Sequence, residues 1–268
     1  MKLSLAQLEI KRGEPAHNLE LIHRRAETAA AEGADLLCLP EMATTGFDWR
    51  KNRELLAEAH HHHEGIAEMA RTERVAICGS FLECSESGKP CNTLLYFDKT
   101  GEVLAKYRKL YLFTLFNEDR HVEAGQEFVV KDIKHGMAGF AVCYDLRFPE
   151  LFRKNTDLGA QIQFLPAAFP HPRLEHWRTL VRARAIENQC FFVAVNQCGV
   201  EGHGEHVGST EYFGHSMVVD PWGNIVIEAG EAPEQVMVDL DLNLVDQTRS
   251  RMTALKDRRP ELYQSAST

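Results

Sequence analysis

Short apolar runs alternate with longer amphipathic stretches along most of the chain. Residues 36–39 and 137–142 are compact apolar runs of a length typical of buried strands, and we also predict a strand at residues 161–165. Residues 18–33 differ, because their apolar side chains recur at helical spacing until Gly33 ends the pattern. This alternation predicts an α/β fold with enough strands for two sheets.

The remaining elements follow the same two patterns. We predict further strands at residues 3–10, 75–82, 92–97, 103–107, 128–133, 190–196, 215–219, 224–228 and 236–240, and helices at residues 53–69, 149–158, 174–188 and 242–251. Residues 199–209 are glycine-rich and polar, which predicts a loop too short to separate two domains. We therefore expect one domain over residues 1–268, with a C-terminal tail from about residue 255 that packs on a partner subunit.

Charge and length narrow the class of protein. The net charge of −9 argues against a nucleic-acid or anionic-membrane partner, because either requires a basic face. The chain has no run of 18 apolar residues, so we expect no membrane span. Residues 1–7 alternate like a strand and lack the apolar core of a signal peptide, and an odd number of cysteines, seven, fits reduced thiols. These features predict a cytoplasmic protein.

Cys143 differs from the other cysteines, most of which lie within apolar runs and are interpreted as buried hydrophobic residues. It follows the apolar run 137–142 directly, and acidic, basic and turn residues come next. Pro149 and Glu150 suit the first turn of a following helix. We therefore expect the thiol at a strand-to-helix corner, where free backbone N–H groups and the local field favour a thiolate.

Two charged residues also follow the ends of predicted strands. Glu41 follows residues 36–39, and Lys109 follows the predicted strand 103–107. Strand ends in α/β proteins converge on a common crevice, so these side chains are expected near Cys143. A thiol, a carboxylate and an ammonium form a set that can cleave amides, as nucleophile, general base and oxyanion stabiliser. Taken singly, Glu41 could be a carboxylate at a helix N-terminus, and Lys109 could be a solvated surface charge. Together with Cys143, the two residues favour a catalytic site.

The same residues resemble the nitrilase superfamily of carbon–nitrogen hydrolases. The resemblance extends from residue 3 to about residue 263 and depends on residues 37–42, 107–113, 143–150, 182–189, 214–216 and 220–223. It implies a four-layer α-β-β-α sandwich in which Glu41 is the general base, Lys109 stabilises the oxyanion and Cys143 is the nucleophile. Amide hydrolysis would proceed through a thioester and release ammonia.

Further site features are implied by the resemblance. The family often uses a second glutamate, and Glu118 matches its position, although it could also be a loop carboxylate. The backbone N–H of Tyr144 would complete the oxyanion hole. The resemblance implies no cofactor and no metal, because the reactants are a small amide and water. It also implies a homodimer or a larger homo-oligomer, and the regularly spaced arginines of residues 178–184 would suit such an interface.

The substrate is indicated by a segment that is similar to the ω-amidase branch, which hydrolyses 2-oxo acid monoamides such as 2-oxoglutaramate and 2-oxosuccinamate. This segment is residues 170–173 followed by His176 and Trp177. Arg173 could bind the distal carboxylate of such a substrate bidentately, or it could be a surface arginine at a helix start. His176 and Phe169 are the other candidate substrate-binding residues.

Several alternatives remain open at the level of sequence. Ala43 and Tyr111 depart from residues common in this branch and would change the shape of the pocket. The same catalytic set would serve an aliphatic nitrilase or an N-carbamoyl amino acid hydrolase. A non-catalytic binding or scaffold protein on the same fold is a further alternative, which the intact catalytic set disfavours. Residues 60–63 are four histidines without the spacing of a zinc site, and we interpret them as a solvated helix face.

Overall fold

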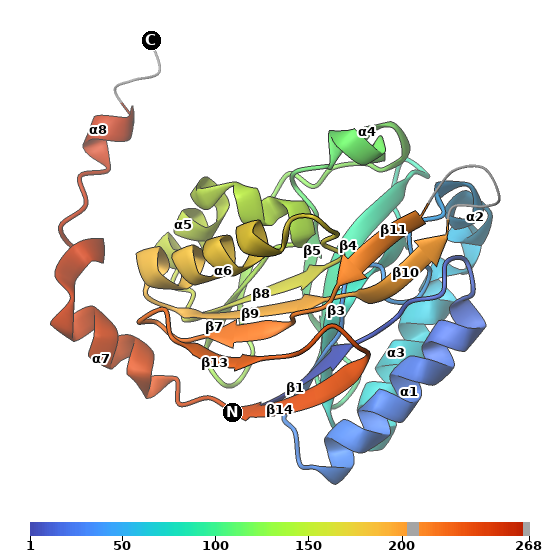
Figure 1. The fold of residues 1–268 in the computed structure, drawn as a ribbon, viewed down its shortest axis with the longest axis horizontal. Coiled ribbons are helices and arrows are strands. Elements are labelled where there is room, and N and C mark those ends of the chain that lie inside the picture. The colour runs from blue at the N-terminus through green and yellow to red at the C-terminus, as the bar shows by residue number, and fades with distance from the viewer. Residues whose placement is uncertain (203–208, 265–268) are drawn as a thin grey trace.

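The computed structural model describes residues 1–202 and 209–264, and these form two six-stranded sheets that pack face to face. Helices cover the outer face of each sheet, so the architecture has four layers in the order α-β-β-α (Figure 1). This confirms the fold class predicted from the sequence. None of the helices within these residues is both long enough and apolar enough to cross a bilayer.

The first sheet has the strand order β14-β1-β2-β3-β4-β5. These strands are β14 (Glu234–Asp239), β1 (Lys2–Gln7), β2 (Leu36–Cys38), β3 (Ala76–Cys84), β4 (Pro90–Phe97) and β5 (Val103–Arg108). The central strands β1, β2 and β3 are parallel, and the strands outside them are antiparallel. Because β2 and β5 belong to one sheet, the residues that follow them can approach the same crevice.

The second sheet has the strand order β13-β12-β9-β8-β7-β6. These strands are β13 (Ile225–Glu228), β12 (Met217–Val219), β9 (Phe191–Asn196), β8 (Ile162–Ala167), β7 (Met137–Phe140) and β6 (Val130–Asp132). Strands β7, β8 and β9 are parallel. The helices α5 (Pro149–Asp157) and α6 (Leu174–Asn188) cover its outer face (Figure 1).

Apart from two long helices on the first sheet, the other described elements are short or peripheral. They are β10 (Cys198–Gly202) and β11 (Ser209–Phe213), the helices α2 (Trp49–Glu54), α4 (Glu118–His121), α7 (Asn243–Arg251) and α8 (Glu261–Gln264), and the 3₁₀ helices Leu55–Glu58, Thr114–Phe116, Cys143–Arg147 and Thr253–Leu255. The helices α7 and α8 extend along the edge of the molecule and away from it (Figure 1). The proposed packing of this tail on a partner subunit stays a prediction.

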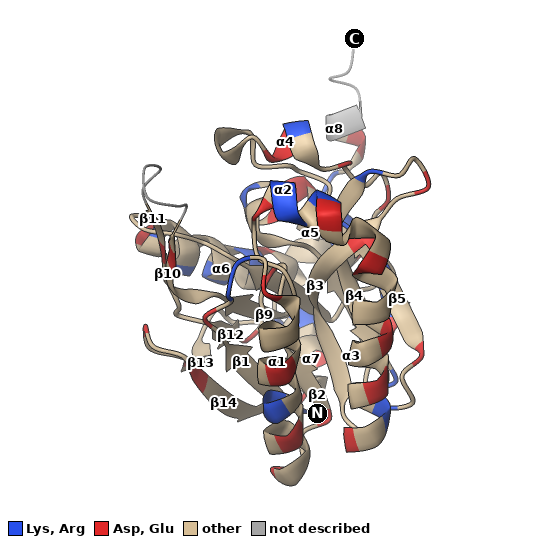
Figure 2. Ribbon diagram, turned by 90° about the vertical axis from the view of Figure 1, so that its right-hand side faces the viewer, with Lys and Arg blue, Asp and Glu red and all other residues tan. Residues whose placement is uncertain are grey.

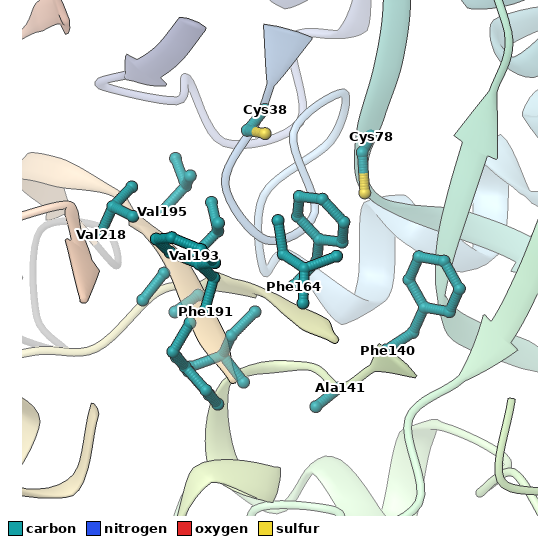
Figure 3. Packing of buried hydrophobic residues seen from close by; sticks show 14 of the residues in the cluster. Cys38, Cys78, Phe140, Ala141, Phe164, Phe191, Val193, Val195 and Val218 are labelled. Atoms are coloured by element: carbon teal, nitrogen blue, oxygen red, sulfur yellow. The ribbon is translucent and has the colours of Figure 1, made fainter. Parts of the chain in front are cut away.

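The main core lies between the two sheets. Cys38 of β2 and Cys78 of β3 face Phe140 of β7 and Phe164 of β8 across the interior (Figure 3). All four side chains are buried, and the interpretation of Cys38 and Cys78 as small hydrophobic residues is confirmed. Burial raises the pKa of both thiols, so they are protonated and unreactive.

A second core lies between the first sheet and the helices α1 (Pro15–Ala31) and α3 (Ala59–Glu73). Ile22, Ala26 and Ala29 form the buried stripe of α1, at the spacing that the sequence predicted. Acidic and basic residues occur along the outer sides of both helices (Figure 2). The amphipathic pattern therefore places each helix on the sheet with its charged side in solvent.

Two predicted elements are wrong. The single helix predicted at residues 53–69 is three elements: α2, a 3₁₀ turn and α3. Asp48 starts α2 early, because its side chain accepts a hydrogen bond of 3.0 Å from the N–H of Lys51. The loop predicted at residues 199–209 contains most of β10 and the start of β11, which pair as an antiparallel ribbon; residues 203–208 lie outside the described residues.

The histidine run at residues 60–63 begins α3, and only half of it is solvated. His60 and His61 are exposed, whereas His62 is buried and the Nε2 atom of His63 lies 2.8 Å from the carbonyl oxygen of Leu82. The prediction of a solvated face is therefore wrong for His62 and His63. The helix turns these two residues toward β3, which a run of identical residues cannot reveal.

Candidate active site

Cys143 begins a 3₁₀ helix, Cys143–Arg147, between the end of β7 and the start of α5. The sequence predicted a direct strand-to-helix corner, and the structure adds this turn. The residue has a φ of 46°, in the left-handed region that a cysteine rarely adopts. Such backbone strain persists where the surrounding structure enforces it, and it is common at functional sites. The side chain is buried and lines a cavity.

Glu41 follows β2 and is fixed at both carboxylate oxygens. Its Oε2 atom accepts a hydrogen bond of 2.9 Å from the N–H of Ala168, and its Oε1 atom accepts one of 2.8 Å from Nδ2 of Asn92. The side-chain amide of Gln197 also donates to the backbone oxygen of Glu41 at 2.8 Å. The carboxylate is buried, so these bonds leave it one orientation.

Lys109 follows β5 and connects two carboxylates. Its Nζ atom donates to Oε1 of Glu41 at 2.9 Å and to both oxygens of Glu118 at 3.0 and 2.8 Å. All three side chains are buried. Burial alone would lower the pKa of Lys109, but the negative charges of Glu118 and Glu41 outweigh it and raise that pKa. The ammonium is therefore charged at neutral pH.

The Cys143 thiol is protonated in the resting site. Burial and the nearby Glu41 carboxylate raise its pKa well above the usual value, although Lys109 acts in the opposite direction. The expectation that the local field favours a thiolate is therefore wrong. The sequence indicated the turn but could not show how completely the folded chain removes the sulfur from water. A nucleophilic role for this sulfur would therefore require a base, and Glu41 lies next to it.

A cavity of about 340 Å³ opens in front of these groups. Its polar floor contains Glu41, Lys109, Glu118 and Cys143. Most of the wall is apolar or aromatic, and three arginines also line it. The other lining residues are Arg12, Phe47, Trp49, Phe113, Leu115, Phe116, Asn117, Tyr144, Arg147, Ala168, Phe169, Pro170, Arg173, Thr210 and Tyr212. A mostly apolar pocket with a few convergent polar groups is typical of a small-molecule site.

The structure places two of the three predicted substrate-binding side chains on this wall. The guanidinium carbon of Arg173 lies 6.0 Å from the ring centre of Phe113, and Phe169 is buried below the guanidinium of Arg147 at 5.3 Å. His176 is exposed on α6 and is not among the cavity-lining residues, but its Nδ1 atom lies 3.4 Å from a guanidinium nitrogen of Arg147, which is, so its part in substrate binding stays a prediction. The next residue, Trp177, faces the core. Because adjacent residues of a helix point about 100° apart, the two side chains face different ways.

The backbone around Cys143 offers a donor to the cavity. Tyr144 lies in the first turn of the 3₁₀ helix, where N–H groups have no partner within the helix. Tyr144 also lines the cavity, and its role as the oxyanion donor stays a prediction.

Sequence reasoning missed many of the residues that bond to the site or line its cavity, among them Asn92, Arg147 and Asp145. Asn92 donates to Glu41 and, at 3.3 Å, to Oε1 of Glu118, and it was hidden within a predicted strand. A fully buried asparagine in an apolar run is the signal that could have revealed it. Arg147 lines the cavity and Asp145 is buried behind Cys143, and both lie within the segment already singled out.

The regularly spaced arginines of α6 bond within the chain. Arg178 pairs with Glu228 at 2.7 Å, and Arg182 and Arg184 donate to the backbone oxygens of Gly223 and Leu146. Their spacing is thus explained inside one subunit, and the predicted subunit interface stays a prediction.

A family model described as carbon–nitrogen hydrolase matches residues 2–250. The chain belongs to the carbon–nitrogen hydrolase family. It is 34% identical over 262 residues to the 2-oxoglutaramate amidase of Bacillus subtilis (strain 168), a match that covers 97% of this chain and 98% of the relative. It is also 34% identical over 255 residues to the deaminated glutathione amidase of Synechocystis sp. (strain PCC 6803 / GT-S), covering 90% and 92% of the two chains.

A solved structure agrees with this carbon–nitrogen hydrolase over its whole length. A mutant of the amidase from Nesterenkonia sp. AN1 superposes with a TM-score of 0.88 at 29% identity, covering 99% of both chains. That structure shows the result of Michael addition of acrylamide at the active-site cysteine. The comparisons confirm the nitrilase-type sandwich, and they confirm that the chain is an enzyme of the class that hydrolyses carbon–nitrogen bonds other than peptide bonds.

Proposed function

We propose that this carbon–nitrogen hydrolase cleaves the terminal amide of a small carboxylic acid amide, a 2-oxo acid monoamide such as 2-oxoglutaramate or 2-oxosuccinamate, and releases ammonia. The observation that supports it most is the buried cluster of Cys143, Glu41 and Lys109 on the floor of a cavity whose wall includes Arg173. The names of the amidases from Bacillus subtilis and Synechocystis point to the same reaction class.

The first half of the reaction forms a thioester. Glu41 takes the proton of the Cys143 thiol, and the sulfur attacks the amide carbon as the C=O electron pair moves to oxygen. The Lys109 ammonium and the Tyr144 N–H stabilise this oxyanion. The electron pair on the oxyanion then re-forms the C=O bond, and the carbon–nitrogen bond breaks. The nitrogen takes the proton held by Glu41 and leaves as ammonia.

The second half hydrolyses the thioester. Glu41, again a carboxylate, takes a proton from water, and the hydroxide attacks the thioester carbon. The carbon–sulfur bond breaks, the carboxylic acid leaves, and the sulfur regains its proton. Glu118 binds Lys109 through both oxygens and so keeps the ammonium oriented between the two half-reactions. Water is the second reactant, and the proposal requires neither a cofactor nor a metal.

The substrate assignment depends on Arg173. A 2-oxo acid monoamide has a carboxylate at the end opposite its amide, and a guanidinium can bind a carboxylate through two parallel hydrogen bonds. Arg147 supplies a second guanidinium on the same cavity. Phe113 and Phe169 lie beneath the two guanidinium groups and limit their motion. The wall therefore offers an anion site at one side of a mainly apolar pocket.

The proposal also includes an assembly and a compartment. We propose a homodimer or a larger homo-oligomer in the cytoplasm. Family resemblance supports the assembly, and the odd number of cysteines, six of them buried, supports the compartment.

An ammonia-release screen tests the proposal. The purified enzyme is assayed with 2-oxo acid monoamides, neutral aliphatic amides, nitriles and N-carbamoyl amino acids, and Cys143→Ala serves as the blank. We expect the highest kcat/KM for the 2-oxo acid monoamides. Preferred turnover of nitriles, or carbon dioxide release from N-carbamoyl amino acids, would replace the amidase assignment by one of the alternatives.

A further inference from the structure

Asp145 is a fully buried carboxylate that takes no part in the proposed chemistry. Its Oδ2 atom accepts hydrogen bonds from the N–H of Val142 at 2.8 Å and from the hydroxyl of Tyr107 at 2.7 Å. Its Oδ1 atom accepts one from the N–H of Tyr111 at 2.9 Å. Three donors thus converge on two oxygens.

These donors come from both halves of the site. Val142 immediately precedes Cys143 and belongs to the turn after β7, in the second sheet. Tyr107 lies in β5 of the first sheet, two residues before Lys109, and Tyr111 lies after the end of that strand, two residues after Lys109. Asp145 therefore joins the backbone that presents the thiol to the backbone that presents the ammonium.

Burial of this carboxylate is costly, which argues for a role besides stability. Its three bonded donors are neutral groups, and the charge of Lys109 acts on it without a direct hydrogen bond among the described contacts. Burial raises its pKa to about 7, although the bonds from Val142 and Tyr111 act in the opposite direction. An apolar side chain at this position would avoid that cost but would leave two N–H groups unpaired.

We propose that Asp145 is a positioning residue that fixes the Cys143 turn against the segment that contains Lys109. The φ of 46° at Cys143 is a strained backbone conformation that persists where the surrounding structure restrains it, and Asp145 binds the N–H of the residue before it. Asparagine cannot replace the carboxylate, because its one side-chain oxygen can accept from the segment of Val142 or from that of Tyr111 but not from both. Its NH₂ group would then face an N–H donor. The inference rests on the proposed use of Cys143 and Lys109.

The test compares Asp145→Asn with Tyr107→Phe, in a Cys84→Ser background that removes the exposed thiol. For Asp145→Asn we expect kcat to fall about 100-fold with KM changed less than about 3-fold, and alkylation of Cys143 by iodoacetamide to slow about 10-fold. Tyr107→Phe leaves both backbone bonds in place, so kcat should stay within about 3-fold. The exposed Asp246→Asn is the matched control.

The outcomes separate this inference from the proposed function. A folded Asp145→Asn variant with unchanged kcat or unchanged alkylation of Cys143 would overturn the positioning role alone. If Asp145→Asn does not fold, Tyr107→Phe decides: a fall in kcat of more than about 10-fold would contradict the role given to the backbone bonds. Full activity in Cys143→Ala would instead overturn the proposed function, whatever the Asp145 variants do.

Discussion

The buried ammonium of Lys109 donates hydrogen bonds to both carboxylate oxygens of the buried Glu118, at 3.0 and 2.8 Å. The same ammonium lies 2.9 Å from Oε1 of Glu41. One buried cation therefore lies between two buried carboxylates and offsets part of their negative charge. This arrangement holds the proposed general base and the proposed oxyanion donor in one rigid unit.

Removing the cation should destabilise the fold. Lys109→Met leaves two buried carboxylates without a cation, so we expect the free energy of unfolding to fall by about 3–5 kcal/mol. Urea denaturation at neutral pH measures this. The exposed Lys131→Met variant is the control and should stay within about 0.5 kcal/mol of the native protein. A Lys109→Met variant as stable as that control would show that the cluster is not held by charge.

Removing the charge of Glu118 should affect the rate more than the binding of substrate. In Glu118→Gln the ammonium keeps one carboxylate partner and can tilt away from the oxyanion, so we expect kcat to fall about 100-fold at nearly constant KM. Steady-state ammonia release measures both constants. Asp119→Asn, an exposed neighbour in α4, should leave both unchanged. Equal effects of the two substitutions would remove Glu118 from the site.

Glu83 should give the protein a stability that depends on pH. Burial alone would raise its pKa, but hydrogen bonds from Arg108, Lys106 and Thr93 lower it to about 2. A carboxyl with a lowered pKa stabilises the fold fully above its unfolded value of 4.5, and this contribution is lost as pH falls toward 2. Arg108 directly precedes Lys109, so the pair also anchors the end of β5.

We therefore expect Glu83→Gln to lower the free energy of unfolding by about 1–2 kcal/mol at pH 7, because solvent partly screens the pair. The difference from the native protein should shrink between pH 4.5 and pH 2. Urea denaturation at several pH values measures it, with the exposed Glu86→Gln variant as control. A difference that stays constant down to pH 2 contradicts this interpretation of Glu83.

Arg173 should select substrates by their distal carboxylate. Arg173→Met should raise KM for 2-oxoglutaramate about 10-fold or more and leave KM for a neutral short amide unchanged, because only the first offers an anion. Arg173→Lys keeps the charge without the bidentate geometry and should give an intermediate KM. Arg120→Met, an exposed arginine that does not line the cavity, is the control. Equal losses on both substrates would exclude Arg173 from carboxylate binding.

The spacing of apolar residues within a short stretch of sequence was enough to predict the elements that depend on this spacing alone. Residues 174–188 were predicted as a helix, and α6 has these bounds, because its apolar spacing is uninterrupted. Glu41, Lys109 and Cys143 were found because each follows an apolar run at a strand end, and the fold brings them together. The helix predicted at residues 53–69 failed because a side-chain cap at Asp48 and a 3₁₀ turn are set by single residues.

The properties that were missed depend on contacts between distant segments. Asn92 contacts Glu41 across 51 positions of sequence, and Asp145 contacts Tyr107 across 38, so periodicity could not pair them. The pKa of Cys143 is raised by burial that only the packed sheets produce. His176 is exposed and approaches the cavity only through Arg147, a contact across 29 positions that its neighbours in sequence do not reveal.

The most direct test of the account is the intact mass of the enzyme during turnover. The native protein is mixed with 2-oxoglutaramate, quenched in acid within milliseconds to seconds, and analysed by mass spectrometry, with Cys143→Ala treated in parallel. We predict an added mass equal to the substrate less ammonia, on the peptide that contains Cys143, and no such species in Cys143→Ala. Ammonia release by Cys143→Ala at the native rate, or an acyl group on another residue, would contradict the central claim.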